Sequence, residues 1–265
     1  MKQSLIKSPH EIEVIARSGE VTAAVLKFLA ERAKIGTRLR DLDTYTRELV
    51  REFSIKTGAD VRPAFLGYHP YGAKRSYPAA LCTSVNDVIV HGCPGEYRVQ
   101  EGDLLKLDFG VIFEGFYSDA ALTVPIGEVS LEARELIAIT REALARGIAQ
   151  ALPGNRLGDI GWAIEHYVRT MSNGRFSVVE GLTGHGVGYA LHEDPSVYNS
   201  GTRGKGLKLE PGMVLALEPM VSAGSPNILQ RSDDSFATAD GSLSAHFEHT
   251  IVITEKGPRI LTAIE

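Results

Sequence analysis

Residues 104–124 read LLKLDFGVIFEGFYSDAALTV. Two apolar runs flank Glu114-Gly115, which indicates a β-hairpin with a short turn. Each run contains one aspartate, Asp108 or Asp119, inside an otherwise apolar strand pattern. The hairpin places these aspartates on adjacent strands at nearly the same rung. Whether they share a face depends on the turn type and on any bulge, and a solvated pair on an edge strand is the alternative.

Helical patterns lie on both sides of this hairpin. A Ser8-x-x-Glu11 capping box with Pro9 at the first position predicts a helix start. A second helix is predicted from near Arg38 to near Thr57, with Gly58 as its stop. Two further helices are predicted near 130–151 and 157–172, separated by Pro153-Gly154.

The remaining apolar segments predict strands. AALCTSV and VIVHG flank the turn signal Asn86-Asp87, and the last third contains SVVEGLTG, MVLALEPMV and HFEHTIVIT. The order is therefore two helices, strands, two helices, strands. We expect one α+β domain over residues 1–265, in which helices cover an antiparallel sheet with pseudo-two-fold symmetry.

The composition is that of an ordinary globular protein. The 265 residues are 43% hydrophobic and 23% charged, and the net charge of −5 gives no indication of a nucleic-acid site. No apolar run approaches the roughly 20 residues of a membrane span, and the N-terminus lacks the pattern of a signal peptide. Only two cysteines occur, Cys82 and Cys93, so we expect a cytoplasmic protein without disulfides or membrane contact.

Four carboxylates lie in apolar strand patterns: Asp108, Asp119, Glu218 and Glu248. A buried anion without a partner costs several kcal/mol and would become neutral instead. The neighbouring residues supply no obvious set of buried arginines. A pair of divalent cations would resolve this conflict.

Three histidines accompany the carboxylates. His185 and His192 lie in GLTGHGVGYALHEDP, where the glycines permit close approach to a ligand, and His91 follows the strand VIV. Each could instead be a satisfied structural histidine. A set rich in oxygen with one or two imidazoles favours manganese, iron or cobalt over a closed structural zinc site, and zinc stays among the candidates.

Five ordered motifs together resemble methionine aminopeptidase of type I, which has the pita-bread fold. They are VNDVIVHGCP, LKLDFGVIFEGFYSDAALT, GHGVGYALHEDP, GMVLALEPM and SLSAHFEHTIV. The resemblance implies a two-metal centre in the middle of the sheet. Its ligands would be Asp108, Asp119, His185, Glu218 and Glu248.

The resemblance also implies an activity, the removal of the initiator methionine from nascent chains whose second residue is small. Glu218 would transfer a proton, His192 would bind the carbonyl oxygen, and His91 would position the substrate. Two-metal sites of aminopeptidases activate a water molecule in this way. Tyr68, Tyr77 and Cys82 would join His91 and His192 in binding the substrate. The partners would be nascent N-termini and the ribosome, and the protein would be a monomer.

Two other functions are open. One is a broader aminopeptidase that prefers proline, although such relatives carry an extra N-terminal domain that we do not expect here. The other is a binding protein that has kept the fold without turnover.

Some positions depart from the type I pattern. The family usually has a small hydroxylated residue at Gly110, a smaller residue at Phe65, and a tryptophan near Phe236. Residues 69–76 form a longer segment, with Lys74 and Arg75, that we expect beside the site.

Overall fold

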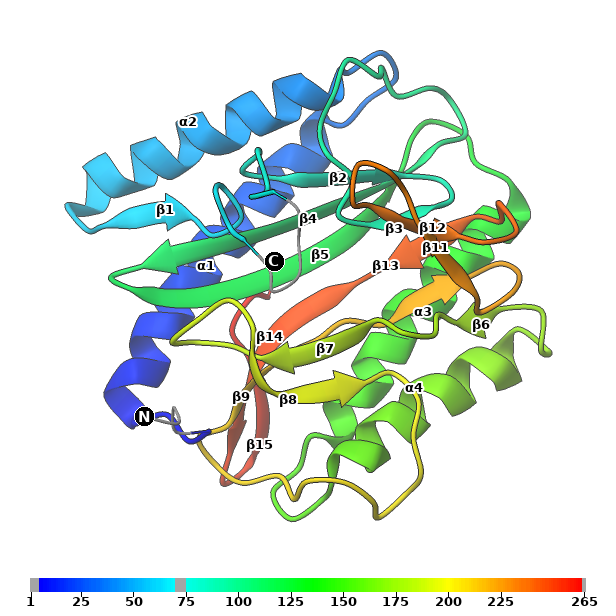
Figure 1. Ribbon diagram of the computed structural model, residues 1–265. Helices are drawn as coiled ribbons and strands as arrows, with labels where there is room; N and C mark the ends of the chain where they lie inside the picture. The colour runs from blue at the N-terminus through cyan, green and yellow to red at the C-terminus, as the bar shows by residue number, and fades with distance from the viewer. Residues whose placement is uncertain (1–4, 70–74, 264–265) are drawn as a thin grey trace.

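A curved antiparallel sheet with four helices packed against it forms the architecture (Figure 1). The structure is a computed structural model, and it describes residues 5–69 and 75–263. The helices are α1 (Pro9–Arg32), α2 (Leu39–Thr57), α3 (Leu131–Gln150) and α4 (Leu157–Met171). This order of helices and strands confirms the predicted α+β fold.

The helix boundaries follow the local sequence signals. The Ser8 side chain accepts a hydrogen bond from the Glu11 amide, and the Ser8 amide donates to the Glu11 carboxylate, so the predicted capping box is formed. Helix α2 ends at Gly58, whose φ of 68° is left-handed and therefore favours glycine.

Strand pairing around the first hairpin is continuous. Strands β4 (Leu104–Phe113) and β5 (Phe116–Pro125) pair from end to end around Glu114-Gly115. Both turn residues have positive φ, 49° and 84°, as a type I′ turn requires. The Asn86-Asp87 turn also forms, but its flanking strands do not make one hairpin. Strand β2 (Cys82–Val85) pairs with β4, whereas β3 (Val88–Val90) pairs with β12 (Phe236–Thr238) from the last third of the chain.

Nine strands of the described residues form the main sheet. Its order is β1-β4-β5-β14-β9-β7-β8, with β2 beside β4 and β15 beside β14. Two smaller sheets have the orders β13-β10-β6 and β11-β12-β3. The strands not yet given bounds are β1 (Val61–Pro63), β6 (Ser177–Val178), β7 (Thr183–Gly186), β8 (Glu193–Tyr198), β9 (Val214–Leu217), β10 (Met220–Ser222), β11 (Ile228–Gln230), β13 (Ser244–His246), β14 (Glu248–Thr254) and β15 (Gly257–Ile260).

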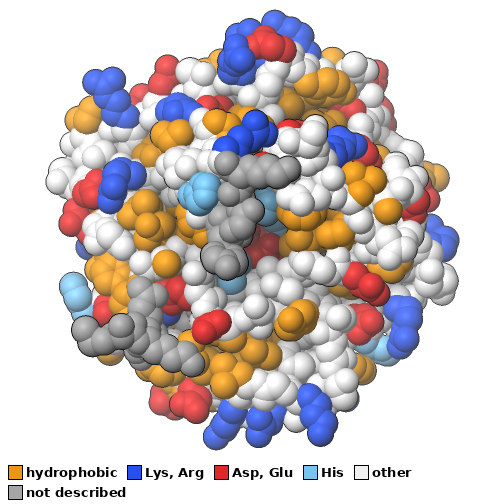
Figure 2. All heavy atoms as spheres, viewed as in Figure 1, with side chains coloured by type: hydrophobic (Ala, Val, Ile, Leu, Met, Phe, Trp, Pro, Cys, Tyr) orange, Lys and Arg blue, Asp and Glu red, His pale blue; other side chains and the backbone are white. Residues whose placement is uncertain are grey.

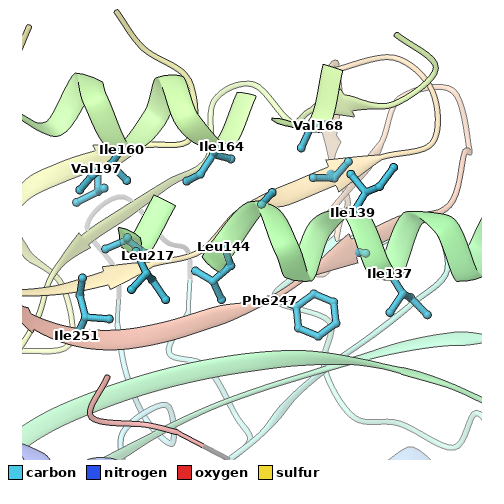
Figure 3. Packing of buried hydrophobic residues seen from close by; sticks show 14 of the residues in the cluster. Ile137, Ile139, Leu144, Ile160, Ile164, Val168, Val197, Leu217, Phe247 and Ile251 are labelled. Atoms are coloured by element: carbon cyan, nitrogen blue, oxygen red, sulfur yellow. The ribbon is translucent and has the colours of Figure 1, made fainter. Parts of the chain in front are cut away.

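Each helix pair builds its own hydrophobic core against part of the sheet. Helices α1 and α2 pack on the odd-numbered residues of β4, from Leu105 to Phe113. Helices α3 and α4 pack on β9 and β14 through residues such as Leu217 and Ile251 (Figure 3). Because side chains alternate along a strand, Asp108 on β4 and Glu248 on β14 face away from these helices. None of the described helices combines the length and apolar character that crossing a membrane requires.

Candidate metal centre and substrate pocket

The strand register places four of the five predicted ligands on one face of the sheet. Residues directly opposite in an antiparallel pair share a face. Ala121 of β5 lies opposite both Asp108 and Glu248, and Asp119 is two residues from Ala121, so these three acidic residues share a face. His185 lies opposite Ala216, which the pairing of β9 with β14 places on the same face.

Three of the predicted ligands converge most closely. One ligand atom from each of Asp119, His185 and Glu248 lies within 4.8 Å of the other two, and all three residues are buried. Among the described residues, Asp119 Oδ1 and Glu248 Oε1 are buried without a hydrogen-bond partner. Unpaired buried carboxylate oxygens are costly, and a divalent cation is the partner that would satisfy them. The residues present therefore fit a metal ion.

The apolar residues around Glu218 predicted a position inside a strand, and this prediction is wrong. Glu218 lies at a break between two strands. Strand β9 ends at Leu217 and β10 begins at Met220, with Pro219 between them. The Asn199 side chain donates to the Glu218 carbonyl oxygen at 3.0 Å, which holds the broken backbone. Glu218 Oε1 lies 3.4 Å from His185 Nε2, so the carboxylate still reaches the centre.

The electrostatics of this cluster favour uncharged side chains in the absence of a cation. Burial raises the pKa of Asp108 to about 7. Burial and the neighbouring carboxylates raise the pKa of Asp119, Glu218 and Glu248 well above their usual range. Burial lowers the pKa of His185 to about 4. A bound divalent cation would favour the carboxylate anions and the neutral imidazole together.

His192 lies beside the cluster in a ring stack. Its ring centroid is 4.3 Å from that of His185 and 5.2 Å from that of Tyr68. The Tyr68 hydroxyl lies 2.6 Å from His192 Nδ1. Burial, reinforced by His185 and His91, lowers the pKa of His192 to about 3. His192 is therefore neutral at pH 7, with Nδ1 engaged and Nε2 available.

His91 lies at the rim of the site. Its φ of 62° is left-handed, which is uncommon for residues other than glycine and marks a constrained backbone. Solvent reaches the ring, whose edge approaches Phe236 with centroids 5.7 Å apart. The Tyr77 hydroxyl donates to the carbonyl oxygens of Leu81 and Gly92, so Tyr77 fixes the segment that follows His91.

An apolar cluster adjoins the acidic face. Cys82 is directly opposite Asp108 and belongs to a buried group that also contains Phe65 and Leu191, with Tyr68 and Tyr77 packed against it. Burial raises the pKa of the Cys82 thiol well above its usual range, so it stays uncharged. The structure thus brings the three predicted pocket residues into one cluster.

Gly110 and Phe65, which both depart from the type I pattern, are neighbours in the structure. A β-carbon at Gly110 would lie 3.1 Å from Phe65 Cε1 and 3.1 Å from Ala64 Cβ. The bulk of Phe65 therefore occupies room that a larger residue at position 110 would need.

The longer segment 69–76 falls mostly outside the described residues, and Lys74 is among those not described. Its ends are joined, because the Tyr77 amide donates to the Tyr68 carbonyl at 2.8 Å. Arg75 lies 3.6 Å from the Asp234 carboxylate.

The sequence did not single out His246. Neither ring nitrogen of this buried side chain has a hydrogen-bond partner among the described residues, and Nε2 lies 3.7 Å from Glu218 Oε2. Burial lowers its pKa to about 3. Its position two residues before Glu248 was the signal that could have found it, because that spacing is the period of a strand.

The surface above these residues is recessed. Figure 2 shows acidic and histidine side chains near the middle of the viewed face, with hydrophobic side chains on either side. A polar, acidic centre beside an apolar wall is the arrangement of a metal site with a side-chain pocket.

Comparison with known proteins identifies the family. Residues 13–255 match the model of metallopeptidase family M24. A methionine aminopeptidase of Clostridium perfringens is 44% identical over 262 residues, which cover 98% of this chain and 99% of the relative. One of Clostridium acetobutylicum is 41% identical over 98% of this chain and 99% of the relative.

Solved structures agree with the sequence comparison. The crystal structure of methionine aminopeptidase from Thermotoga maritima has a TM-score of 0.90 and 40% identity, with 99% of both chains covered. A prolidase from Pyrococcus furiosus shares the fold alone, at 24% identity and a TM-score of 0.76. The chain belongs to the methionine aminopeptidases of metallopeptidase family M24.

Proposed function

We propose that this chain hydrolyses the first peptide bond of proteins and peptides that begin with methionine and have a small second residue. The observation that carries the proposal is the cluster of buried carboxylates and imidazole, with unpartnered oxygens on Asp119 and Glu248, directly beside an apolar cluster. The family membership supports the same activity.

Two divalent metal ions would be held by the five residues that the sequence predicted: Asp108, Asp119, His185, Glu218 and Glu248. Once bound, the metals would supply a water nucleophile that is deprotonated near neutral pH and would polarise the scissile carbonyl. Carboxylates from strands of both halves of the chain meet here, so the folded sheet itself positions the ligand set.

His192 acts on the carbonyl oxygen of the scissile bond. When the Tyr68 hydroxyl donates to Nδ1, the single proton of the neutral imidazole resides on Nε2. Nε2 then donates a hydrogen bond to the oxygen as it gains negative charge, which stabilises the transition state more than the ground state. Tyr68 thus fixes both the tautomer and the ring orientation.

Glu218 handles the proton of the reaction. Its carboxylate reaches the centre from the break between β9 and β10 and approaches His185 with one oxygen and His246 with the other. A group placed there can accept a proton from the attacking water and deliver it to the departing amine. His91, at the solvent-reached rim, orients the substrate near that amine.

The cluster of Phe65, Tyr68, Tyr77, Cys82 and Leu191 accepts the methionine side chain. An unbranched thioether fits an irregular apolar and aromatic pocket. Because Cys82 lies opposite Asp108, a side chain in this pocket places the first peptide bond over the acidic centre. The second side chain then faces the sheet, where glycines flank His185 and where a large group would collide.

The setting of this activity is part of the proposal. The substrates are nascent polypeptides in the cytoplasm, and a monomer meets them as they leave the ribosome. The scarcity of cysteine is consistent with a cytoplasmic setting. Sedimentation of the protein alone and with ribosomes measures both features.

Removal and return of metal, combined with a peptide panel, tests the function. Dialysis against a strong chelator should abolish cleavage of Met-Ala-Ser, and manganese, iron, cobalt or zinc should restore it. Met-Gly-Ser should be cut, whereas Met-Lys-Ser and Met-Phe-Ser should not. Glu248→Gln should lose activity and metal, whereas Glu255→Gln, at an exposed turn, should keep both. Full activity without metal, or a preference for peptides with proline in second place, would refute the proposal.

A further inference from the structure

Lys106 is an unusual residue at the edge of the site. It lies on β4, two residues before Asp108 and on the same face, and it is only 1% exposed. Lysine is almost never fully buried without a partner, because its ammonium group loses hydration. Among the described residues, no carboxylate lies within ion-pair distance of its nitrogen.

Backbone and hydroxyl oxygens replace water around this ammonium group. Lys106 Nζ donates to the Asn86 carbonyl at 2.6 Å, to the Ser244 carbonyl at 3.3 Å and to the Ser244 hydroxyl at 3.2 Å. An ammonium has three protons, so each has an acceptor. The Ser244 hydroxyl in turn donates to the Asn86 carbonyl at 2.8 Å, which closes the network.

The two acceptor residues belong to segments that lead into the site. Asn86 begins the turn before β3, and His91 follows that strand. Ser244 begins β13, and Glu248 begins the next strand, β14. Lys106 therefore connects three stretches of chain that are distant in sequence and that each carry a site residue.

The Asn86 backbone needs such support. Its φ of 54° is left-handed, and its side chain is bound to Asp103 and to the Leu104 amide. These contacts fix one side of the turn to β4, while Lys106 and Ser244 hold its carbonyl from the other side. Lys106 Nζ contacts both acceptor residues at once, so this nitrogen joins the two segments to β4 in one network.

We propose that Lys106 is a positioning residue whose ammonium group fixes the segment before His91 and the segment before Glu248 against the strand that carries Asp108. Its role in catalysis rests on the proposed function, whereas its effect on the two segments does not. Loss of partners that orient a metal site costs roughly 10–100-fold in metal affinity or activity.

Hydrogen exchange of metal-free protein tests the effect of Lys106 on the two segments separately from its role in catalysis. Lys106→Met keeps the apolar length of the side chain and removes its charge. Amide exchange should accelerate in residues 86–91 and 244–248, while the amides of α3 and α4 should keep their protection. Lys56→Met, on the exposed side of α2, is the matched control and should change neither segment.

Chemical rescue identifies the ammonium as the active group. Lys106→Ala leaves out a propyl chain and the amine, so n-propylammonium should restore protection of both segments and part of the lost kcat/KM. Neutral 1-propanol and tetramethylammonium, which has no N–H group, should not. If the Lys106 variants do not fold, Ser244→Ala removes one acceptor and should produce the same local pattern more weakly.

Unchanged exchange in both segments of a folded variant would overturn the proposal. So would a uniform increase over the whole chain, which indicates general destabilisation. Altered exchange with no activity in the wild type would retain the structural role of Lys106 and refute the proposed function instead.

Discussion

Replacing Asp108 by asparagine should stabilise the metal-free protein, and the gain should grow with pH. Without a cation, burial raises the pKa of Asp108 from 3.8 to about 7. A carboxyl whose pKa is raised on folding contributes its stability below the pKa of the unfolded chain. That contribution is lost as the pH rises through the pKa of the folded protein. Asparagine has no such charge and removes the penalty.

The magnitude follows from the size of the shift. One pKa unit corresponds to 1.36 kcal/mol, so a shift of about three units is worth at most about 4 kcal/mol. The window runs from about pH 4, where the unfolded carboxyl ionises, to about pH 7. The buried histidines shift in the opposite sense, because burial lowers the pKa of His185 to about 4. They are present in both proteins and cancel in the difference.

Urea unfolding at a series of pH values, with a strong chelator present, measures this difference. The free energy of unfolding of Asp108→Asn minus that of the wild type should rise from pH 4 to pH 7 and then level off. Glu52→Gln, at an exposed position on α2, is the control and should give a flat difference. Adding a divalent metal should reverse the order at pH 7, because the variant has lost a ligand. A difference that does not depend on pH would show that burial does not raise the pKa of Asp108.

Two further predictions concern the residues around the centre. His192→Ala should lower kcat by roughly 10²–10³ while metal affinity measured by titration stays nearly constant. Tyr68→Phe should cause a smaller loss of kcat, because it removes the hydroxyl that contacts His192. Loss of metal from His192→Ala would contradict the role assigned to His192. Gly184→Ala should cost about 1–3 kcal/mol of stability and weaken metal binding, because its β-carbon would lie 2.3 Å from the Ala216 carbonyl oxygen beside His185. The control is Gly95→Ala, whose β-carbon would have nothing within 4 Å. It should change neither quantity in the same unfolding and metal-titration assays.

The sequence predicted the helices and the first hairpin well because their signals are local. The capping box at Ser8, the stop at Gly58 and the Glu114-Gly115 turn each depend on residues within a few positions of one another. Periodicity then extends these elements over whole helices and strands. The order of elements along the chain was therefore enough for the fold class.

The pairing of strands was harder to predict from the sequence. The turn at Asn86-Asp87 was visible, but β2 and β3 find partners 20 or more residues away, in β4 and β12. Local propensity cannot choose between a neighbouring strand and a distant one, since the choice depends on packing of the whole sheet. The shared face of Asp108 and Asp119 was open for the same reason, until the uninterrupted register settled it.

Residues that act from breaks and buried networks were the hardest to find. Glu218 was found because it is an acidic residue in an apolar run. Its position after the end of β9 was not predicted. Lys106 carries the same kind of signal, a charged residue in an apolar run, but it was not singled out, and the signal for His246 is weaker. Their importance comes from unpaired nitrogens in one case and from distant carbonyl oxygens in the other.

The placement of the centre follows from how the two halves of the chain meet. Asp108 and Asp119 come from the first half, whereas His185, Glu218 and Glu248 come from the second. The halves are joined within the main sheet by the short ladder between β5 and β14, which pairs Ala121 with Glu248 and Ala120 with His249. Beyond it, the Thr250 hydroxyl accepts from the Asp119 amide at 2.9 Å and donates to the Asp119 carbonyl at 2.8 Å.

A short seam suffices because of what lies on each side of it. The helix pairs pack each half into its own core, so the seam need not supply most of the stability. On the opposite face, carboxyl groups from both halves ionise together at neutral pH only when a cation lies between them. Neither half holds the ligand set alone, so metal binding stabilises the union of the halves and creates the catalytic site in the same step.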